Sequence, residues 1–300
     1  MSRPACAPVP PPPLGTRELH ALPAPAKLNL FLHIIGRRED GYHLLQSVFA
    51  LIDWCDRLDF EWRSDARISR QDGTLSPHAS LPEHDLCVRA AQALQQHTGC
   101  TQGVHIRLDK HLPMEAGLGG GSSDAATTLI ALNRLWDLRL SRPQLMAIAA
   151  ELGADVPFFV FGHNAWVEGI GEQLRALSLP PRRVTVVKPP QGVSTAEIFR
   201  SPQLKRDTKP ATMAGFAGSQ GDGSPYAFGR NDLQALASLQ CPSIETVVRW
   251  LESKGVAARM TGSGSAVFAT HTETIDLTGA APDWVVQSSC VMGAHPLADW

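Results

Sequence analysis

The feature that most constrains this 300-residue chain is a glycine-rich segment at residues 113–124, PMEAGLGGGSSD. Three of its glycines are consecutive, and the segment leads into AATTLIALNRLW, whose apolar residues have helical spacing. Consecutive glycines let backbone N–H groups converge without obstruction by side chains. The N-terminus of the following helix adds unsatisfied donors and the positive end of the helix dipole. The segment therefore predicts an anion-binding loop in preference to a flexible loop followed by a serine-capped helix.

Known phosphate-loop patterns fit this segment only in part. The P-loop requires a lysine after its last glycine, and no lysine follows any of these glycines. The dinucleotide pattern G-x-G-x-x-G fits at Gly117 and Gly119, but Ser122 occupies the third glycine position. The protein-kinase glycine loop fails at the same position. Ser122 and Ser123 offer hydroxyls to a phosphate oxygen or to a water bound to magnesium, so phosphate binding is predicted on physical grounds.

Charge and composition argue against several other classes of protein. The net charge of −2 gives no reason to expect nucleic acid as a partner. The longest apolar runs, LNLFLHII and VPFFVFG, are shorter than a membrane span, and we expect neither a membrane segment nor a secretory signal. The six cysteines are scattered without a C-x-x-C pair, which argues against a disulfide framework or a zinc site and favours the cytoplasm. The histidine spacings predict no metal ligands.

Hydrophobic periodicity predicts an α+β fold with two lobes joined around residues 160–180. Residues 1–22 are expected to be a disordered proline-rich arm, with a docking peptide as the alternative. The lobes are then expected at residues 23–170 and 171–300, with a long mobile loop at 201–230. Strands are expected in LNLFLHIIG, LLQSVFALI, RLDFEW, GVHIRLD, RRVTVVK, VAARMTGSGSAVFAT and DWVVQSSCVM. Helices are expected in HDLCVRAAQALQQHT, from Ser122 onward, in SRPQLMAIAAEL and in PSIETVVRWLESK. Gly99 is expected to end the first of these helices, and Ser141 and Gln144 are expected to form a capping box at the start of SRPQLMAIAAEL.

Four motifs together resemble the superfamily of galactokinase, homoserine kinase, mevalonate kinase and phosphomevalonate kinase. They are PAPAKLNLFLHIIGRREDGYH, PMEAGLGGGSSDAA, LGADVPFF and MTGSGSAVFA, and the resemblance extends from about residue 23 to the C-terminus. Within the superfamily, the motifs are most similar to the branch that phosphorylates the 2-hydroxyl of cytidine diphosphate methylerythritol in non-mevalonate isoprenoid synthesis. Glu115 and Ala116 depart from the small residues, often glycines, of that branch.

This resemblance implies an ATP-dependent kinase that uses Mg²⁺, with its active site in the cleft between an N-terminal ATP-binding lobe and a C-terminal substrate lobe. The implied partner is the small-molecule substrate, without nucleic acid or membrane, and the implied state is a monomer or a weak homodimer. Lys27 and Asp155 would be the catalytic residues. ATP would bind at Pro113, Met114, Glu115, Ala116, Gly117, Leu118, Gly119, Gly120, Gly121, Ser122 and Ser123. The substrate would bind at Asn29, Tyr42, His43, Thr195, Phe199, Gly262, Ser263 and Gly264.

The catalytic residues also stand out on physical grounds. Lys27 opens an apolar strand, where a charge is costly without an anionic partner, although a lysine at a strand edge can extend to solvent. Asn29 lies two residues later, on the same strand face. Asp155 follows the end of a helix, where the dipole disfavours a carboxylate, and no obvious helix begins after it. A solvated turn aspartate is the alternative. The resemblance implies that Asp155 accepts the hydroxyl proton and that Lys27 orients it.

The remaining motifs are less specific. Tyr42 and His43 form part of a DGYH turn, and without a binding role they would be turn residues with rings packed on the surface. TGSGSAVF would, without a binding role, be a plain hairpin. The resemblance implies that Tyr42 and Phe199 stack on cytosine, that His43 contacts its edge and that Thr195 adds a polar contact. It also implies that Gly262, Ser263 and Gly264 lie close to the phosphate loop and the substrate. Two other functions stay open: a related kinase acting on mevalonate, homoserine or a sugar, or a non-catalytic nucleotide sensor, against which Lys27 and Asp155 argue.

Overall fold

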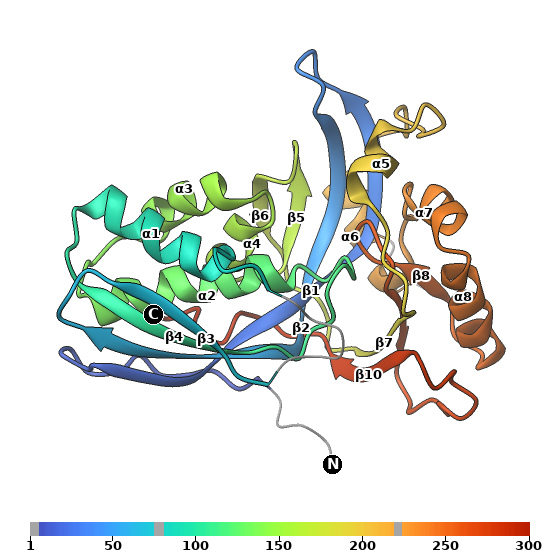
Figure 1. Ribbon diagram of the computed structural model, residues 1–300. Helices are drawn as coiled ribbons and strands as arrows, with labels where there is room; N and C mark the ends of the chain where they lie inside the picture. The colour runs from blue at the N-terminus through green and yellow to red at the C-terminus, as the bar shows by residue number, and fades with distance from the viewer. Residues whose placement is uncertain (1–5, 75–80, 219–223) are drawn as a thin grey trace.

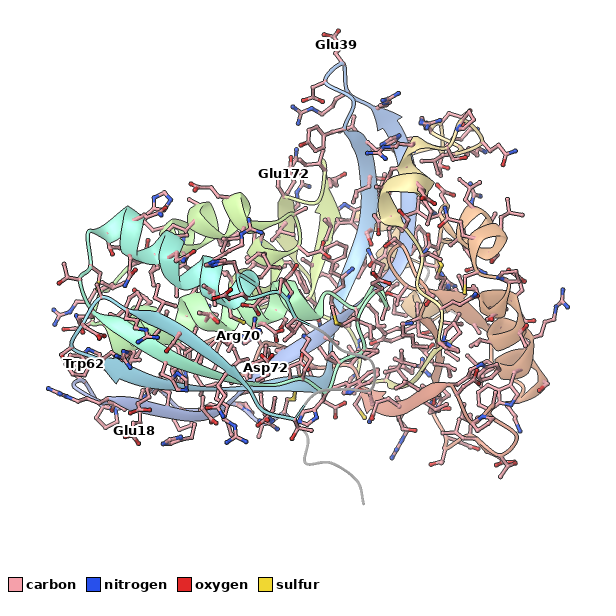
Figure 2. All side chains as sticks on the ribbon, in the orientation of Figure 1. Glu18, Glu39, Trp62, Arg70, Asp72 and Glu172 are labelled. Carbon is pink, nitrogen blue, oxygen red and sulfur yellow. A yellow bond between two sulfur atoms is a disulfide. The ribbon has the colours of Figure 1, made fainter. Side chains whose placement is uncertain are left out.

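Two β-sheets with helices packed on them form the two halves of the protein in the computed structural model (Figure 1). The structure describes residues 6–74, 81–218 and 224–300. Strands β1 (Glu18–Arg37) and β2 (His43–Arg63) form a long antiparallel hairpin that rises between the two halves. Figure 2 shows Glu39 at the tip of this hairpin. The α+β class and the two-part architecture are as expected from the sequence.

The first sheet has six strands and carries its helices on one face (Figure 1). Its strand order is β3-β4-β2-β5-β6, with β1 paired to β2. The other strands are β3 (Ile68–Asp72), β4 (Gly103–Asp109), β5 (Ala165–Glu168) and β6 (Gln173–Ala176). The helices are α1 (Leu86–Thr98), α2 (Gly120–Leu135), α3 (Arg142–Leu152) and α4 (Val156–Phe161).

The core of this half lies between the sheet and its helices. On β4 the alternating residues Val104, Ile106 and Leu108 are fully buried, which confirms the predicted half-buried strand. On α2, Leu129 and Leu132 pack into the same core. Burying a side chain of this size contributes about 1.5–3 kcal/mol, so the alternation of β4 and the apolar face of α2 hold the glycine-rich segment between two well-packed elements.

The second sheet has four strands, in the order β10-β7-β9-β8. They are β7 (Arg183–Lys188), β8 (Ala258–Met260), β9 (Val267–His271) and β10 (Val285–Cys290). Helices α7 (Gln234–Gln240) and α8 (Ser243–Ser253) pack on this sheet, and Figure 1 shows them at the outer side of this half. Helix α5 (Thr195–Arg200) lies beside the β1–β2 hairpin.

The predicted helix stop at Gly99 and the predicted capping box of Ser141 are confirmed, and Asp85 is a further cap. The side chain of Asp85 accepts the Val88 N–H at the start of α1, and Gly99 ends this helix with φ 67°. Ser141 and Gln144 form the predicted capping box at the start of α3. Arg70 of β3, labelled in Figure 2, places its Nη1 3.0 Å from the Asp85 carboxylate and so joins the sheet to the start of α1.

Other boundaries differ from the prediction. LLQSVFALI and RLDFEW belong to one continuous strand, β2, although Asp53 and Trp54 between them have no partner on β1: pairing stops at Ile52, opposite Ala26, and resumes at Cys55, opposite Pro25. Helix α2 begins at Gly120, two residues before the expected start, because the glycines themselves adopt helical backbone. β6 pairs with β5 in the first sheet, so this sheet extends beyond the expected lobe boundary at residue 170.

The described part of the proline-rich segment is not disordered, so that expectation is wrong for residues 6–22. Val9 exchanges two hydrogen bonds with the C-terminal segment, through Pro296 O (2.9 Å) and Trp300 Nε1 (2.7 Å). Arg134 donates to Pro12 O at 3.0 Å. Prolines lack N–H donors but keep their carbonyls, and the Arg134 side chain satisfies the carbonyl of Pro12. Residues 1–5 lie outside the described part of the chain.

A disulfide joins Cys6 to Cys55 of β2, with Cα atoms 7.0 Å apart, although the scattered cysteines argued against a disulfide framework. The expected long loop at 201–230 contains α6 (Met213–Gly218) and a 3₁₀ turn at Pro225–Ala227, and residues 219–223 within it are not described. Arg259 donates to carbonyls of residues 227–229 and holds this segment in place. Among the helices that the structure describes, none has the length and apolarity to cross a membrane.

Candidate active site

Lys27 is a buried cation on β1, only 3% exposed. Its Nζ donates to Asn29 Oδ1 at 2.5 Å and lies 3.5 Å from Asp155 Oδ2. The ring of Phe49 lies 4.8 Å from the same nitrogen. The lysine therefore has the anionic partner that its burial requires, and the prediction that Asn29 shares its strand face is confirmed.

Asp155 occupies the N-cap position of α4, a six-residue helix that the sequence analysis did not foresee. Proline in the first turn and an apolar FFVF run conceal this helix from a periodicity argument. Its carboxylate makes no capping hydrogen bond, although a helix N-terminus favours a negative charge there. The expectation of an unfavourable position for Asp155 was wrong. The side chain turns toward Lys27 instead, and it is 33% exposed, so an outside molecule can reach it.

Hydrogen bonds from both its backbone N–H and its side-chain amide hold Asn29 in place. Its backbone N–H donates to Thr261 Oγ1 at 2.8 Å, and its Nδ2 donates to Ser47 Oγ at 3.0 Å. Thr261 immediately precedes the second glycine turn, so one strand residue connects the lysine to that turn. The amide of Asn29 is consequently fixed in orientation next to the Lys27–Asp155 pair.

The two glycine turns pack directly against each other, as expected from the resemblance. Gly117 has φ +72°, and a Cβ at this position would overlap the Thr261 carbonyl oxygen and lie 3.1 Å from Gly264 N. A Cβ on Gly262 would lie 3.0 Å from Gly117 Cα. The amide of Ser265 donates to a carbonyl of the glycine-rich segment at 3.2 Å. Glycine is required at this contact because no side chain fits between the two backbones.

A pocket of about 630 Å³ opens over the glycine-rich segment. It is lined by every residue from Pro113 to Ser122, which places ten of the eleven predicted ATP-binding residues on one surface. Ser123 does not line this pocket, because it is fully buried behind it. Leu81, Pro82 and Leu86 add an apolar wall. The shape and lining suit a molecule with an apolar body and an anionic end.

Three buried charged residues form a cluster at this pocket, which Lys110 and Asp124 line and Asp56 does not. Lys110 Nζ lies 2.5 Å from Asp56 Oδ2 and 2.6 Å from Asp124 Oδ2. Burial by itself lowers the pKa of Lys110, but the charges of Asp124 and Asp56 outweigh it and raise the pKa above its usual value. Burial raises the pKa of Asp124 well above the usual range. The second Asp124 oxygen, Oδ1, is buried without a hydrogen-bond partner among the described residues.

A second pocket, of about 480 Å³, contains Tyr42, His43 and Phe199 together. The rings of His43 and Phe199 lie 5.1 Å apart and are inclined by 36°, while Tyr42 is 60% exposed. His43 and Phe199 are 156 residues apart in the sequence, and their placement together with Tyr42 is the arrangement that the resemblance implied. Arg37, Arg200 and Arg206 also line this pocket and give it a positive rim.

Thr195 lies elsewhere than expected. It lines the glycine-loop pocket, where its Oγ1 is 2.6 Å from Ser263 Oγ, and it does not line the aromatic pocket. The reason is its position at the start of α5, four residues and about one helical turn before Phe199. Helix α5 therefore contributes to both pockets, with Thr195 at one and Phe199 at the other.

Sequence reasoning missed several residues that shape the site. Lys110, Asp124 and Arg206 were not selected, and neither were Thr261 and Ser47. A signal existed for Lys110, a charged residue directly after the buried strand β4, and for Asp124, an acidic residue inside an apolar helix. Arg206 had no local signal, because its partner His43 lies 163 residues away.

The chain is similar to known proteins over most of its length. Residues 85–163 match the model of the GHMP kinases N terminal domain, and residues 223–275 match the GHMP kinases C terminal model. The chain is 58% identical to the 4-diphosphocytidyl-2-C-methyl-D-erythritol kinase of Acidovorax ebreus (strain TPSY), over 95% of this chain and 99% of that protein. It is 56% identical to the protein of the same name from Polaromonas naphthalenivorans (strain CJ2), over 95% and 96% of the two chains.

Solved structures of two kinases are also similar to this chain over most of its length. A crystal structure of 4-(cytidine 5'-diphospho)-2C-methyl-D-erythritol kinase has a TM-score of 0.72 and 33% identity, and it covers 92% of this chain and 100% of its own. L. major mevalonate kinase in complex with R-mevalonate has a TM-score of 0.65 at 15% identity, covering 95% and 98% of the two chains. The latter similarity concerns the fold alone.

Proposed function

The chain belongs to the 4-diphosphocytidyl-2-C-methyl-D-erythritol kinases of the GHMP kinase family, and we propose that its two pockets divide the two substrates of that reaction between them. ATP binds over the glycine-rich segment, and the cytosine of 4-diphosphocytidyl-2-C-methyl-D-erythritol binds among the aromatic residues. The enzyme transfers the γ-phosphoryl group of ATP to the 2-hydroxyl of that substrate.

The observation that carries this proposal is the Lys27–Asp155 pair beside the glycine-rich segment. The Lys27 amide donates to Leu118 O at 3.0 Å, and a Cβ on Gly119 would lie 3.3 Å from Lys27 Cε, so the lysine borders the phosphate loop itself. Asp155 is the more exposed member of the pair and is the group that a substrate hydroxyl can approach. Asp155 accepts the hydroxyl proton as the oxygen attacks phosphorus, and Lys27 holds the carboxylate in place.

The buried parts of the site support phosphate binding. The first N–H groups of α2 have no partner within the helix and point out of its N-terminus, where the helix dipole favours an anion. The positive charge of Lys110 lies close to Gly120, since a Cβ there would be 3.1 Å from its Nζ. Backbone donors, a helix dipole and a fixed cation together replace the lysine that a P-loop supplies.

Magnesium fits the same place. Asp124 lines the glycine-loop pocket, and its Oδ1 atom has no partner within the described chain. A carboxylate oxygen next to bound phosphates is the kind of ligand that Mg²⁺ prefers, with the remaining positions taken by phosphate and water. The ion would neutralise charge on the β- and γ-phosphates. Asp124 would hold it on the protein side, and no larger cluster of His, Cys, Asp and Glu is present among the described residues.

The aromatic pocket accounts for the choice of the second substrate. Tyr42 and Phe199 supply the faces on which a base stacks, and His43 supplies hydrogen bonds to its edge. Because α5 borders both pockets, one extended molecule can place its base at Phe199 and its polyol near the Lys27–Asp155 pair. The arginines at the rim of the aromatic pocket suit the diphosphate that joins the base of the substrate to its polyol.

Turnover of a panel of substrates tests the proposal. ADP release is measured with 4-diphosphocytidyl-2-C-methyl-D-erythritol, with mevalonate, with homoserine and with ATP alone, each over a titration of Mg²⁺. We expect rapid turnover with the cytidine compound only, and none without Mg²⁺. Equal turnover of mevalonate or homoserine would show a related kinase instead, and ATP binding without turnover of any acceptor would show a nucleotide sensor.

A further inference from the structure

Arg206 makes a contact with His43 that the proposed function does not use. Its Nε donates to His43 Nε2 at 2.9 Å, inside the aromatic pocket. No hydrogen bond from His43 Nδ1 to another described residue is present, so this nitrogen is the one left for a ligand.

This contact determines where the imidazole carries its proton. A guanidinium stays charged in proteins and has only donors, so the nitrogen facing it must be an acceptor. In neutral imidazole one nitrogen accepts and the other donates. Burial, followed by the charges of Arg206 and Arg37, lowers the pKa of His43 and favours this neutral form. With Nε2 occupied as an acceptor, the proton lies on Nδ1.

Arg206 is itself held firmly enough to impose this choice. Its Nη1 donates to Leu204 O at 2.9 Å, and its Nη2 donates to Ser201 O at 2.8 Å and to Phe199 O at 3.3 Å. Carbonyls therefore occupy the outer donors of the guanidinium, and Nε is directed at the imidazole. The contact to Phe199 O also ties the arginine to the residue whose ring forms the other side of the pocket.

We propose that Arg206 is a positioning residue that makes the pocket select cytosine over uracil, an inference that rests on the proposed function of this pocket. An Nδ1–H donor matches N3 of cytosine, which is an acceptor. N3 of uracil carries a hydrogen, so the same donor would face another donor. Uracil would fit only if the imidazole changed tautomer, and Nε2–H would then face the Arg206 N–H.

Three arginine variants test this assignment. In Arg206→Gln the amide can either donate to Nε2 or accept from it, so the tautomer is no longer imposed. In Arg206→Lys the replacement keeps a cationic donor. Arg200→Gln removes another arginine that lines the pocket and makes no hydrogen bond to His43 among the described contacts, which makes it the matched control. For each protein, kcat/KM is measured with the cytidine substrate and with its uridine analogue.

We expect wild-type enzyme to prefer the cytidine substrate by about tenfold to a hundredfold or more, the effect of one wrongly paired buried group. Arg206→Gln should lose most of this ratio, through a higher KM for cytidine and a lower KM for uridine, while Arg206→Lys and Arg200→Gln should keep it. The KM for ATP and the thermal unfolding midpoint serve as controls of folding. A parallel loss for both bases in Arg206→Gln would show a merely structural role and overturn the inference.

A second measurement needs no variant of Arg206. Imidazole ¹⁵N chemical shifts of the ligand-free protein report which ring nitrogen carries the proton, and the His43 signals are those that disappear in His43→Gln. We expect protonated Nδ1 in wild-type enzyme, and protonated Nε2 would overturn the inference. If Nδ1 is protonated but wild-type enzyme uses both bases equally, the proposed cytosine pocket fails instead, so the two failures are distinguishable.

Discussion

Gly117→Ala is the substitution whose effect follows most directly from the geometry of the site. Gly117 has φ +72°, a conformation that costs an L-residue about 1–2 kcal/mol. The added methyl would also overlap the Thr261 carbonyl oxygen. Relieving such an overlap between backbones typically costs about 1–3 kcal/mol more. We therefore expect Gly117→Ala to lower the free energy of unfolding by about 2–5 kcal/mol.

Gly121→Ala is the matched control in the same segment. Gly121 lies in the first turn of α2, its φ is not in the left-handed region, and a Cβ there would meet Leu86 Cδ1 at an ordinary 3.5 Å. Alanine in place of glycine within a helix stabilises by about 0.5–1 kcal/mol. Glycine to alanine is thus expected to lower the free energy of unfolding at Gly117 and to raise it at Gly121, four residues later.

Urea unfolding of both variants, followed by circular dichroism, measures these effects. Calorimetry with ATP should show weaker binding for Gly117→Ala, because separating the two glycine turns displaces the phosphate loop. Wild-type stability in Gly117→Ala would refute the reasoning, since the close approach of the two backbones would then not exist. An equal loss in Gly121→Ala would show a general sensitivity of the segment instead.

Three further outcomes follow from the site. Tyr42→Ala or Phe199→Ala should raise the KM for the cytidine substrate about tenfold to a hundredfold, because stacking contributes about 1–3 kcal/mol per ring. Steady-state kinetics should show no change in the KM for ATP, and an equal rise in both constants would contradict the separate base pocket. Burial and two nearby arginines lower the pKa of His43. The imidazole therefore stays neutral when the pH falls to the ordinary pKa of histidine, about 6.5. The KM for the cytidine substrate should therefore be constant from about pH 8 to about pH 6.5 and rise only below that, and a rise beginning at neutral pH would contradict the lowered pKa. Lys110→Met should cost about 3–5 kcal/mol in urea unfolding, because it leaves two buried carboxylates without their cation; a loss below about 1 kcal/mol would show that they are not charged together.

Sequence patterns over a few residues predicted those parts of the site whose residues are close together in the chain. The glycine-rich segment, the helix after it and the Lys27/Asn29 face depend on spacings of a few residues, and the structure confirms each arrangement. The contact between Gly117 and the turn at Gly262 was expected only through the resemblance, because no spacing connects residues so far apart.

The misses have physical causes. Helix α4 escaped notice because six residues are too few for a helical period to appear, and this hid the N-cap position of Asp155. Arg134 and Trp300 bind the proline-rich segment through its carbonyls, which composition cannot reveal. Arg206 finds His43 only through the folded path of the chain.

The assignment of Asp155 as the base is the central claim, and single-turnover phosphoryl transfer by Asp155→Asn tests it most directly. Asparagine keeps the size of the side chain but cannot accept the proton. Asp283→Asn, an exposed aspartate outside both pockets, is the control. We expect the rate of Asp155→Asn to fall by about 10²- to 10⁴-fold, with the affinities for ATP and the cytidine substrate retained and the control unchanged. A rate near that of wild type in folded Asp155→Asn that binds both substrates would contradict the account.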